Sequence, residues 1–592
     1  FRVRGSGPTP ALSLTAEQDE SGHAALKGTR QAYFDHAFVA TPVYDRYALR
    51  PGTKISGPAI IEEREATTVI PPRDQVEIDD VGNIRIQIAT AQQSPIRISA
   101  DMPVAQAVAT IERDPIALEI MWSRLVNVVE EMWLTVCRTA FSLVISESQD
   151  FACELLDATG ETLAHSPRAM PVFNLTLPLA VKALLERYPP ETLREGDVLI
   201  TNDPWLCAGH LFDIAVVTPC FRAGKLVGLL GTVGHVSDIG GTKDSLRARE
   251  IYEEGFQIPP MKLFDAGVPN ETLYRLLAEN VRNSHQVIGD LNSFVGANRL
   301  GAERLLAFMH DYGMEDLRAL AQVVQERSEK AMRQAIAAIP DGVYHATIQN
   351  NPLGQVLTYP VSVAVRGDEI EIDFDGAPPQ LPQGGLNSTL NYTAAHATYP
   401  LKCMLTPSVR GNAGCYRPFT VKAPDGSVLN PRRPASVNIR TRTGWYIAPN
   451  IFRALADAAP AQVQAFTGLP VAANIYGQTQ DGVTYSDLLF IGGGQGASQQ
   501  RDGKSGLLWP TSAANTSIEL FETRVPVLVL EKTYLENSGG AGRQRGGLGQ
   551  RVRFRKLNAD GQTALVSVYP EGVGNPTPGL YGGQPGGEAS GV

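Results

Sequence analysis

Two histidines, each followed three positions later by an acidic residue, are the strongest chemical signal in this sequence. His210 precedes Asp213 and His235 precedes Asp238, in a chain that has only nine histidines. Imidazole and carboxylate groups together suit a divalent ion such as Zn²⁺, Mn²⁺ or Fe²⁺. Two such pairs at the ends of adjacent strands could converge on one metal site. The spacing leaves a second interpretation open, in which each histidine is bonded to the acid that follows it.

Two further aspartates carry similar alternatives. Asp203 lies in Asn202-Asp203-Pro204, a combination typical of a turn because Asn and Asp bond to the local backbone and Pro fixes the next residue. Asp150 precedes the apolar run that begins at Phe151. Its carboxylate is therefore either the cap of a helix or turn, or a remote metal ligand.

Glycine-rich segments are a separate candidate site. Residues 492–496 and 539–547 could bind an anion through backbone amides, but neither segment matches a phosphate-binding loop. Tight turns are the favoured interpretation. The sequence contains no Gly-x-Ser-x-Gly elbow, and no cysteine lies in a motif that marks a nucleophile.

The two histidines need strands to position them, and the sequence predicts such strands. Apolar segments at 198–201, 214–219 and 225–233 are typical of buried strands. Asp114 and Pro115 read as an N-cap followed by Pro in the first turn, which predicts a long amphipathic helix upstream. Further helices are expected near residues 179–188, between 271 and 339, and near 449–458.

Four regions follow one another along the chain. Residues 1–90 are predicted to form a small β-rich module, because short β-branched runs are bounded by Pro and Gly. Residues 91–111 show no clear period and are predicted to be a linker. Residues 112–340 combine the candidate site with helices, and residues 341–592 alternate β segments with loops. The predicted fold class is α+β: a multidomain protein with mixed β-sheets, a helical segment in the middle and a β-rich C-terminal half.

Length and composition exclude several classes of protein. The chain has 592 residues, of which 43% are hydrophobic, and a formal net charge of −10. These values exclude disordered, collagen-like and disulfide-stapled proteins. The acidic balance argues against a nucleic-acid partner, and no apolar run predicts a membrane span or signal peptide. Six scattered cysteines predict reduced thiols and a cytoplasmic location. Phe1–Arg4 are expected to be a strand entered in mid-fold, so the chain is expected to be part of a larger polypeptide or complex.

From about residue 112 to the C-terminus, the sequence resembles the B-type subunit of the hydantoinase/oxoprolinase family. The resemblance rests on separate motifs at Asp114-Pro115-Ile116, Ser148-Gln149-Asp150-Phe151, 202–213, 235–241, Ala423-Pro424-Asp425-Gly426-Ser427, 492–496 and 538–547. Residues 1 to about 90 resemble the C-terminal tail of the A-type, ATP-using subunit, through Leu49-Arg50-Pro51-Gly52 and Gly57-Pro58-Ala59-Ile60-Ile61. This order of parts is expected of a fused 5-oxoprolinase-like polypeptide.

The resemblance implies ATP-dependent opening of a small cyclic amide, of the 5-oxoprolinase or hydantoinase type. The A-type half would use ATP and Mg²⁺ to phosphorylate the ring carbonyl oxygen, and the B-type half would hydrolyse the activated species at a divalent metal. The family's metal ligands fall on His210, Asp213 and His235, with Asp150 as the fourth. Asp203 and Asp238 then become candidates for orienting the ligands or for proton transfer. The A-type nucleotide domain lies outside this sequence, so the chain alone is not expected to use ATP.

Two other functions are compatible with the sequence. A sister branch of the family carboxylates ketones, and the large subunit of such a carboxylase would share the metal site but need bicarbonate. A non-catalytic scaffold subunit would need only turns and packing at the two His-x-x-Asp pairs, so the retention of both pairs argues against it. Pairing with the A-type half, or homo-oligomerisation, is expected from the resemblance.

Overall fold

The computed structural model describes residues 24–35, 37–89, 96, 98, 102–242, 245–557, 563–568 and 572–590. The chain divides into two compact units, residues 1–95 and residues 96–592. The strand predicted at Phe1–Arg4 lies outside the described residues.

The described part of the first unit contains two small sheets. Their strand orders are β1-β2-β4-β5 and β3-β6-β7. The core between them consists of small and branched apolar side chains such as Ile55, Ile61 and Val76. The strands are β1 (Leu26–Phe34), β2 (Ala37–Asp45), β3 (Lys54–Ser56), β4 (Ala59–Glu62), β5 (Thr67–Ile70), β6 (Gln75–Ile78) and β7 (Ile84–Gln87).

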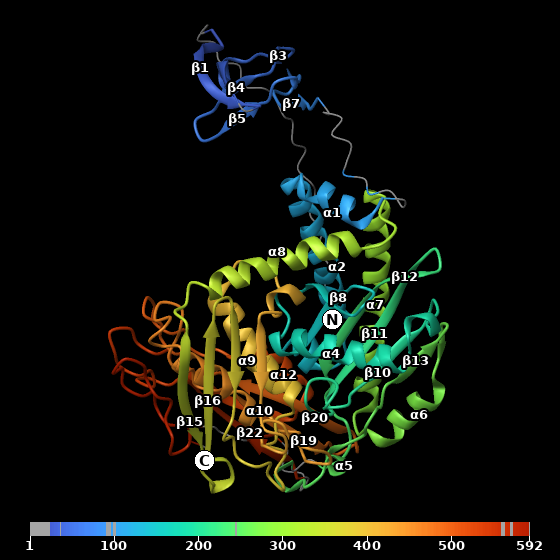
Figure 1. The fold of residues 1–592 in the computed structure, drawn as a ribbon, viewed down its shortest axis with the longest axis vertical. Helices are drawn as coiled ribbons and strands as arrows, with labels where there is room; N and C mark the ends of the chain where they lie inside the picture. The colour runs from blue at the N-terminus through green and yellow to red at the C-terminus, as the bar shows by residue number, and fades with distance from the viewer. Residues whose placement is uncertain are drawn as a thin grey trace. The chain divides into compact units, whose positions relative to one another are not determined.

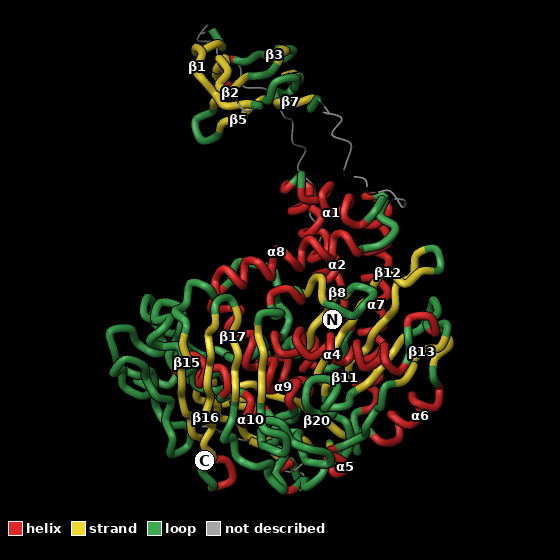
Figure 2. The backbone as a smooth tube through the Cα atoms, viewed as in Figure 1, coloured by secondary structure: helices red, strands yellow, loops and turns green. Residues whose placement is uncertain are grey.

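The second unit contains a seven-stranded antiparallel sheet with the order β14-β13-β10-β11-β12-β8-β9. Helices α2 and α7 pack on one face and α4 on the other, so the sheet lies between two helical layers (Figures 1 and 2). The strands are β8 (Phe151–Leu156), β9 (Thr162–His165), β10 (Val198–Thr201), β11 (Asp213–Arg222), β12 (Lys225–His235), β13 (Met261–Asp265) and β14 (Val268–Pro269). The helices are α2 (Pro115–Thr139), α4 (Pro171–Arg187) and α7 (Ser284–Tyr312).

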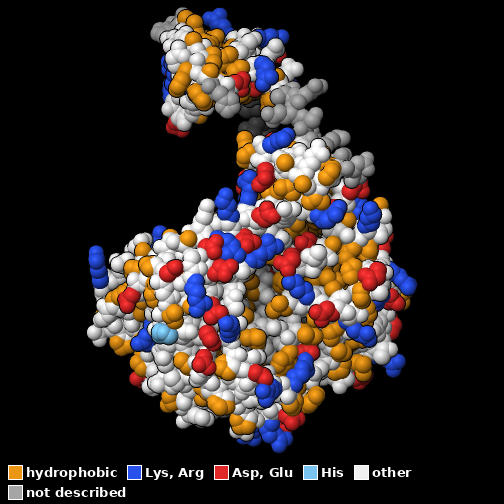
Figure 3. Space-filling view, in the orientation of Figure 1, with side chains coloured by type: hydrophobic (Ala, Val, Ile, Leu, Met, Phe, Trp, Pro, Cys, Tyr) orange, Lys and Arg blue, Asp and Glu red, His pale blue; other side chains and the backbone are white. Residues whose placement is uncertain are grey.

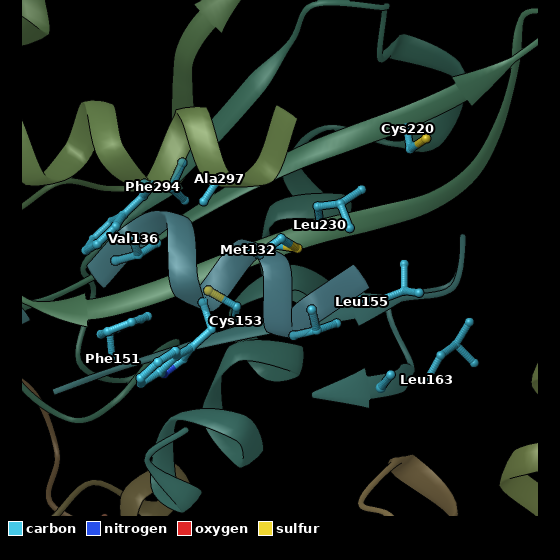
Figure 4. Close-up of a cluster of buried hydrophobic side chains, with 14 of the residues drawn as sticks. Met132, Val136, Phe151, Cys153, Leu155, Leu163, Cys220, Leu230, Phe294 and Ala297 are labelled. Carbon is cyan, nitrogen blue, oxygen red and sulfur yellow. The ribbon is translucent and has the colours of Figure 1, made fainter. Parts of the chain in front are cut away.

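Alternation of side chains along the strands builds a core on each face of this sheet. Figure 4 shows the core under α2 and α7, where Met132 and Phe294 from these helices meet Phe151, Cys153 and Leu230 from the strands. Ala152 and Leu156, the alternate residues of β8, instead join the core under α4. Because both faces are covered, the strands read as continuous apolar segments, which is why the sequence predicts them well.

The start of α2 agrees with its sequence signal. The Asp114 side chain accepts a hydrogen bond from the Ala117 N–H at 3.0 Å, and Pro115 occupies the first turn. The helix buries Leu118, Met121 and Leu125, which recur at helical spacing. A long helix with a cap and an apolar stripe is therefore predictable from local sequence alone.

Helix positions differ from the sequence predictions at several places, including α9 (Leu390–Leu405), which lies where β segments and loops were expected. α1 (Val104–Glu112) occupies the second half of the segment predicted to be a linker. It buries only Ala107 and Ile111, which lie one turn apart. Two apolar residues are too few to show the periodicity of a helix. α4 begins at Pro171, before the predicted residue 179, and continues through Pro178, a residue type that normally interrupts a helix.

Smaller sheets and helices make up the rest of the second unit. The sheet orders are β15-β16-β17-β18, β20-β19-β23 and β21-β22. The strands are β15 (Gly342–Asn350), β16 (Leu357–Arg366), β17 (Glu369–Asp373), β18 (Phe419–Lys422), β19 (Val471–Gln478), β20 (Thr484–Ile491), β21 (Val527–Tyr534), β22 (Gln550–Lys556) and β23 (Leu565–Val568). The helices are α3 (Leu143–Ser146), α5 (Ile251–Glu254), α6 (Glu271–Asn280), α8 (Arg318–Ile336), α9 (Leu390–Leu405), α10 (Thr441–Gly444), α11 (Ile447–Ala454) and α12 (Ile518–Arg524). The α+β, multidomain class with mixed sheets and a central helical segment is confirmed.

The glycine-rich segments pack against one another through their backbones. A Cβ atom on Gly494 would lie 1.9 Å from the carbonyl oxygen of Gly547, and one on Gly547 would lie 2.0 Å from that of Lys504. Real Cβ atoms do not approach backbone oxygens this closely, so only glycine fits at both positions. Close packing of chain segments thus explains the glycines at these two positions.

Charged side chains of both signs are interspersed on the face shown in Figure 3. On α8, Arg333 pairs with Glu329 at 3.0 Å and with Glu369 of β17 at 3.1 Å. Ion pairs at or near the surface each contribute about 1 kcal/mol or less. In the described segments, no helix combines the length and apolar character needed to cross a bilayer.

Candidate metal centre

Three neighbouring strands bring the predicted ligands to one end of the seven-stranded sheet. Asp213 is the first residue of β11 and His235 is the last residue of β12, and the two face each other in the antiparallel register. Asp150 directly precedes β8, and its carbonyl oxygen accepts a hydrogen bond from the His235 N–H at 3.0 Å. His210 lies in the loop between β10 and β11. Sheet pairing therefore fixes three of these four positions.

Asp213 is the centre of the cluster. Its Oδ1 lies 2.7 Å from Nε2 of His210 and 3.3 Å from Nδ1 of His235. One ligand atom from each of the three residues lies within 4.8 Å of the others. Of the two histidines, only His210 contacts the acid three positions after it. His235 approaches Asp213 rather than Asp238, and Asp238 has other partners. The structure thus brings two histidines and one carboxylate together.

Where His210 contacts Asp213, a lone pair on the imidazole nitrogen faces a lone pair on the carboxylate oxygen. Nδ1 of His210 lies 3.0 Å from the carbonyl oxygen of Asn438, which can only accept, so Nδ1 carries the proton. Burial, together with the nearby Arg440, lowers the pKa of His210 to about 4, so Nε2 is unprotonated at neutral pH. Neither Nε2 nor Oδ1 of Asp213 has a hydrogen-bond partner among the described residues. A cation placed between them would satisfy both atoms.

A buried arginine holds the other oxygen of Asp213. The Arg440 guanidinium donates to Oδ2 at 2.6 Å and to the Ala208 carbonyl at 2.9 Å. Although burial alone would raise it, His210 and Arg440 hold the pKa of the Asp213 carboxyl well below its usual range. Asp213 is therefore anionic and oriented, with Oδ1 left toward the two histidines.

Asp150 supplies a second carboxylate beside this cluster. Its Oδ1 is buried and has no hydrogen-bond partner among the described residues. Burial raises the pKa of Asp150 to about 6. An orphaned buried carboxylate oxygen next to imidazole ligands fits a divalent cation, because the donor set is the nitrogen and oxygen mixture that Zn²⁺, Mn²⁺ and Fe²⁺ accept. Asp150 lies outside the compact group of three ligand atoms.

The four residues line one cavity of about 140 Å³. Its apolar wall includes Phe173, Phe212 and Phe490. Polar lining comes from distant parts of the chain: Asn438, Arg440, His396, Asn474 and Ser486. The site is therefore a small, partly open chamber lined by both apolar and polar side chains, as small-molecule sites commonly are.

Asp203 and Asp238 are not brought into this chamber. Asp203 accepts a hydrogen bond from the Trp205 N–H at 3.0 Å and pairs with Arg433, so its turn interpretation is the one that its contacts support. Asp238 is fully buried and accepts from the Arg282 side chain at 2.8 Å and the Arg282 N–H at 2.6 Å. Neither aspartate is among the residues that line the cavity.

Several residues of the site were not predicted from the sequence. Arg440, Asn438 and His396 lie more than 150 positions from the histidine pair and reach it only through tertiary packing. Arg440 and Arg442, two buried arginines just before the helix predicted near residue 449, are the one local signal that could have indicated part of this wall.

Comparisons with known proteins agree with the architecture. The hydantoinase B/oxoprolinase profile matches residues 114–591, and the hydantoinase/oxoprolinase C-terminal domain matches residues 2–86. The B-type subunit of a putative D-/L-hydantoinase from Pseudomonas sp. (strain NS671) is 32% identical over 76% of this chain and 79% of its own length. 5-Oxoprolinase 1 from Arabidopsis thaliana is 29% identical over 99% of this chain, but the match spans only 46% of that protein.

Solved structures show the same fold. An ATP-dependent caprolactamase from Pseudomonas jessenii matches with a TM-score of 0.71 and 29% identity, over 81% of this chain and 83% of its own. A nucleotide-free acetone carboxylase matches with a TM-score of 0.73 and 20% identity, over 82% of this chain and 68% of its own, which concerns the fold alone. The chain therefore belongs to the hydantoinase B/oxoprolinase family and carries, ahead of that region, a hydantoinase/oxoprolinase C-terminal domain.

Proposed function

We propose that this chain is the metal-dependent hydrolytic part of an ATP-dependent cyclic amide hydrolase. The observation that carries the proposal is the convergence of His210, Asp213 and His235, with unpartnered buried atoms, on one chamber beside Asp150. The family supports the reaction class, since relatives carry the names hydantoinase, 5-oxoprolinase and caprolactamase. The substrate is a small cyclic amide whose ring carbonyl oxygen is phosphorylated by an A-type half.

The chain's own residues prepare the site for hydrolysis. Asn438 fixes the tautomer of His210, and Arg440 fixes the orientation of Asp213. Phe173, Phe212 and Phe490 form apolar walls that limit the water around the reacting carbon. A divalent ion held by His210, Asp213, His235 and Asp150 would lower the pKa of a water molecule and polarise the carbon under attack.

An A-type, ATP-using partner is part of this proposal. Residues 2–86 match a domain named for hydantoinase/oxoprolinase, and two relatives are named as subunits. The chain spans about half the length of the 5-oxoprolinases from Arabidopsis thaliana and Dictyostelium discoideum that it matches. The ATP-using half is therefore proposed to lie on the remainder of a longer polypeptide or on a separate subunit.

The test is ATP-coupled turnover of the complete complex. We expect release of a ring-opened amino acid and ADP from 5-oxoproline, hydantoin or caprolactam, without bicarbonate. With ¹⁸O in the ring carbonyl, the label is expected in inorganic phosphate, because the carbonyl oxygen leaves with the phosphoryl group. Bicarbonate-dependent consumption of a ketone, with no cyclic amide opened, would contradict the proposal and indicate a carboxylase.

Replacing Asp203 by asparagine is expected to leave the metal content unchanged and kcat/KM within about threefold of the wild type. Its partner Arg433 has a side chain that is 44% exposed, and such pairs contribute about 1 kcal/mol or less. Metal analysis and the coupled assay on D203N check this. A hundredfold loss of kcat with the metal retained would instead indicate that Asp203 transfers a proton.

A further inference from the structure

His396 is a buried histidine of the chamber that the metal centre does not use. It lies on α9, is 1% exposed, and lines the same cavity as His210 and Asp213. Neither of its ring nitrogens has a hydrogen-bond partner among the described residues. Buried polar side chains are normally paired, so two orphaned nitrogens on one ring need an explanation.

Aromatic contacts hold the His396 ring in place. Its centroid lies 4.4 Å from that of Tyr392 and 5.7 Å from that of Tyr399, about one turn away on either side along α9. Gly444 packs beside them, and a Cβ there would lie 2.4 Å from Cε1 of Tyr392 and 3.4 Å from Cδ2 of His396. The ring is thus oriented by packing alone, which leaves both nitrogens for another group.

The charge state of His396 follows from its surroundings. Burial, reinforced by the nearby Arg440, lowers the pKa of His396 to about 3. The imidazole is therefore neutral at physiological pH, with one N–H donor and one acceptor nitrogen. An apolar ring would fill the same space without orphaned polar atoms, so packing does not account for a histidine here.

A chain of contacts joins His396 to the metal centre. Tyr392 lies against His396, and the Arg440 guanidinium lies 4.4 Å from the Tyr392 ring centroid. The same guanidinium binds Oδ2 of Asp213 at 2.6 Å. Asp213 and His396 line the same small cavity, so a molecule held beside Asp213 shares that cavity with the unpartnered nitrogens of His396.

From this geometry we infer that His396 is a substrate-binding residue that hydrogen-bonds the polar edge of the cyclic amide and so selects and orients the ring. A neutral imidazole has one donor and one acceptor nitrogen, so it can pair with the ring nitrogen of the activated amide whether or not that nitrogen carries a proton. This inference rests on the proposed function, because it names a residue that recognises the substrate of the same site.

The test uses the complete complex and three variants of His396. H396F keeps an aromatic ring and removes both nitrogens, whereas H396N and H396Q place an amide near the position of Nδ1 or Nε2. We expect H396F to lower kcat/KM for 5-oxoproline, hydantoin or caprolactam at least tenfold, mainly through KM. Metal content should be unchanged, and the midpoint of thermal unfolding equal or higher, because an unsatisfied polar group is removed. One of the two amide variants should recover part of the loss.

The outcomes separate this inference from the proposed function. The matched control is H345Q, which changes an exposed histidine on β15 and should behave as wild type. If wild type opens a cyclic amide and H396F retains its KM and kcat, the inference is wrong while the function stands. If H396F does not fold, H396N and H396Q decide the test. A kcat and a KM equal to those of the wild type in both variants would overturn the inference. If the wild-type complex opens no cyclic amide, the proposed function and this inference both fail.

Discussion

The D213N variant is expected to lose the metal and to reduce ATP-coupled turnover at least about 100-fold. Asp213 approaches both histidines through Oδ1 and binds Arg440 through Oδ2. An amide of the same shape supplies no negative charge to the ion, and changes even to outer partners of a metal site typically cost about 10- to 100-fold. Arg440 also becomes an unpaired buried cation, which costs about 3–5 kcal/mol.

Metal content, kcat and the midpoint of thermal unfolding should be measured together for D213N. The matched control is D265N, because Asp265 pairs with Lys262 at 2.6 Å but its side chain is 66% exposed. We expect D265N to match wild type in all three measurements. Retention of a full complement of metal in D213N would show that Asp213 is not a ligand.

The R440M variant is expected to be strongly destabilised, and more so without metal than with it. The Arg440 side chain is 5% exposed and that of Asp213 is fully buried, so the variant leaves an anion without its cation. Breaking a buried pair from one side costs about 3–5 kcal/mol. A bound divalent ion neutralises part of the charge on Asp213, so the cost should shrink when the metal is present.

Thermal unfolding with metal and with chelator measures this difference for R440M. We expect a lower midpoint than wild type in both conditions, with the larger fall in chelator, and a loss of turnover because Asp213 is no longer oriented. R304M is the control, since Arg304 and Glu131 form an exposed pair at 2.6 Å. An R440M protein as stable as R304M in chelator would contradict the ion pair described above.

Local sequence predicted the elements whose signals lie within one segment. The cap at Asp114 and the helical spacing after it located α2, and continuous apolar runs located β10, β11 and β12. α1 was missed because it buries only Ala107 and Ile111, so its period is not visible. Observed elements extend past their predicted bounds where tertiary packing stabilises residues that carry no helix or strand signal of their own, as at the start of α4.

The candidate site divides in the same way. His210, Asp213 and His235 could be predicted because their residue types and short spacing already suit a metal, and the register of β11 and β12 then joins them. The partners of Asp203 and Asp238 could not be predicted, because Arg433 and Arg282 come from distant segments. Arg440 and His396 were missed for the same reason, since the tertiary contacts that bring them to this cavity carry no local pattern.

Metal analysis of the purified complex tests the central claim most directly. Wild type, H210A and H235A should be analysed by plasma emission beside the ATP-coupled assay. The account predicts about one divalent ion per chain in wild type, and its loss together with turnover in both variants. Metal-free wild-type protein that remains fully active, or variants that keep both metal and activity, would contradict it.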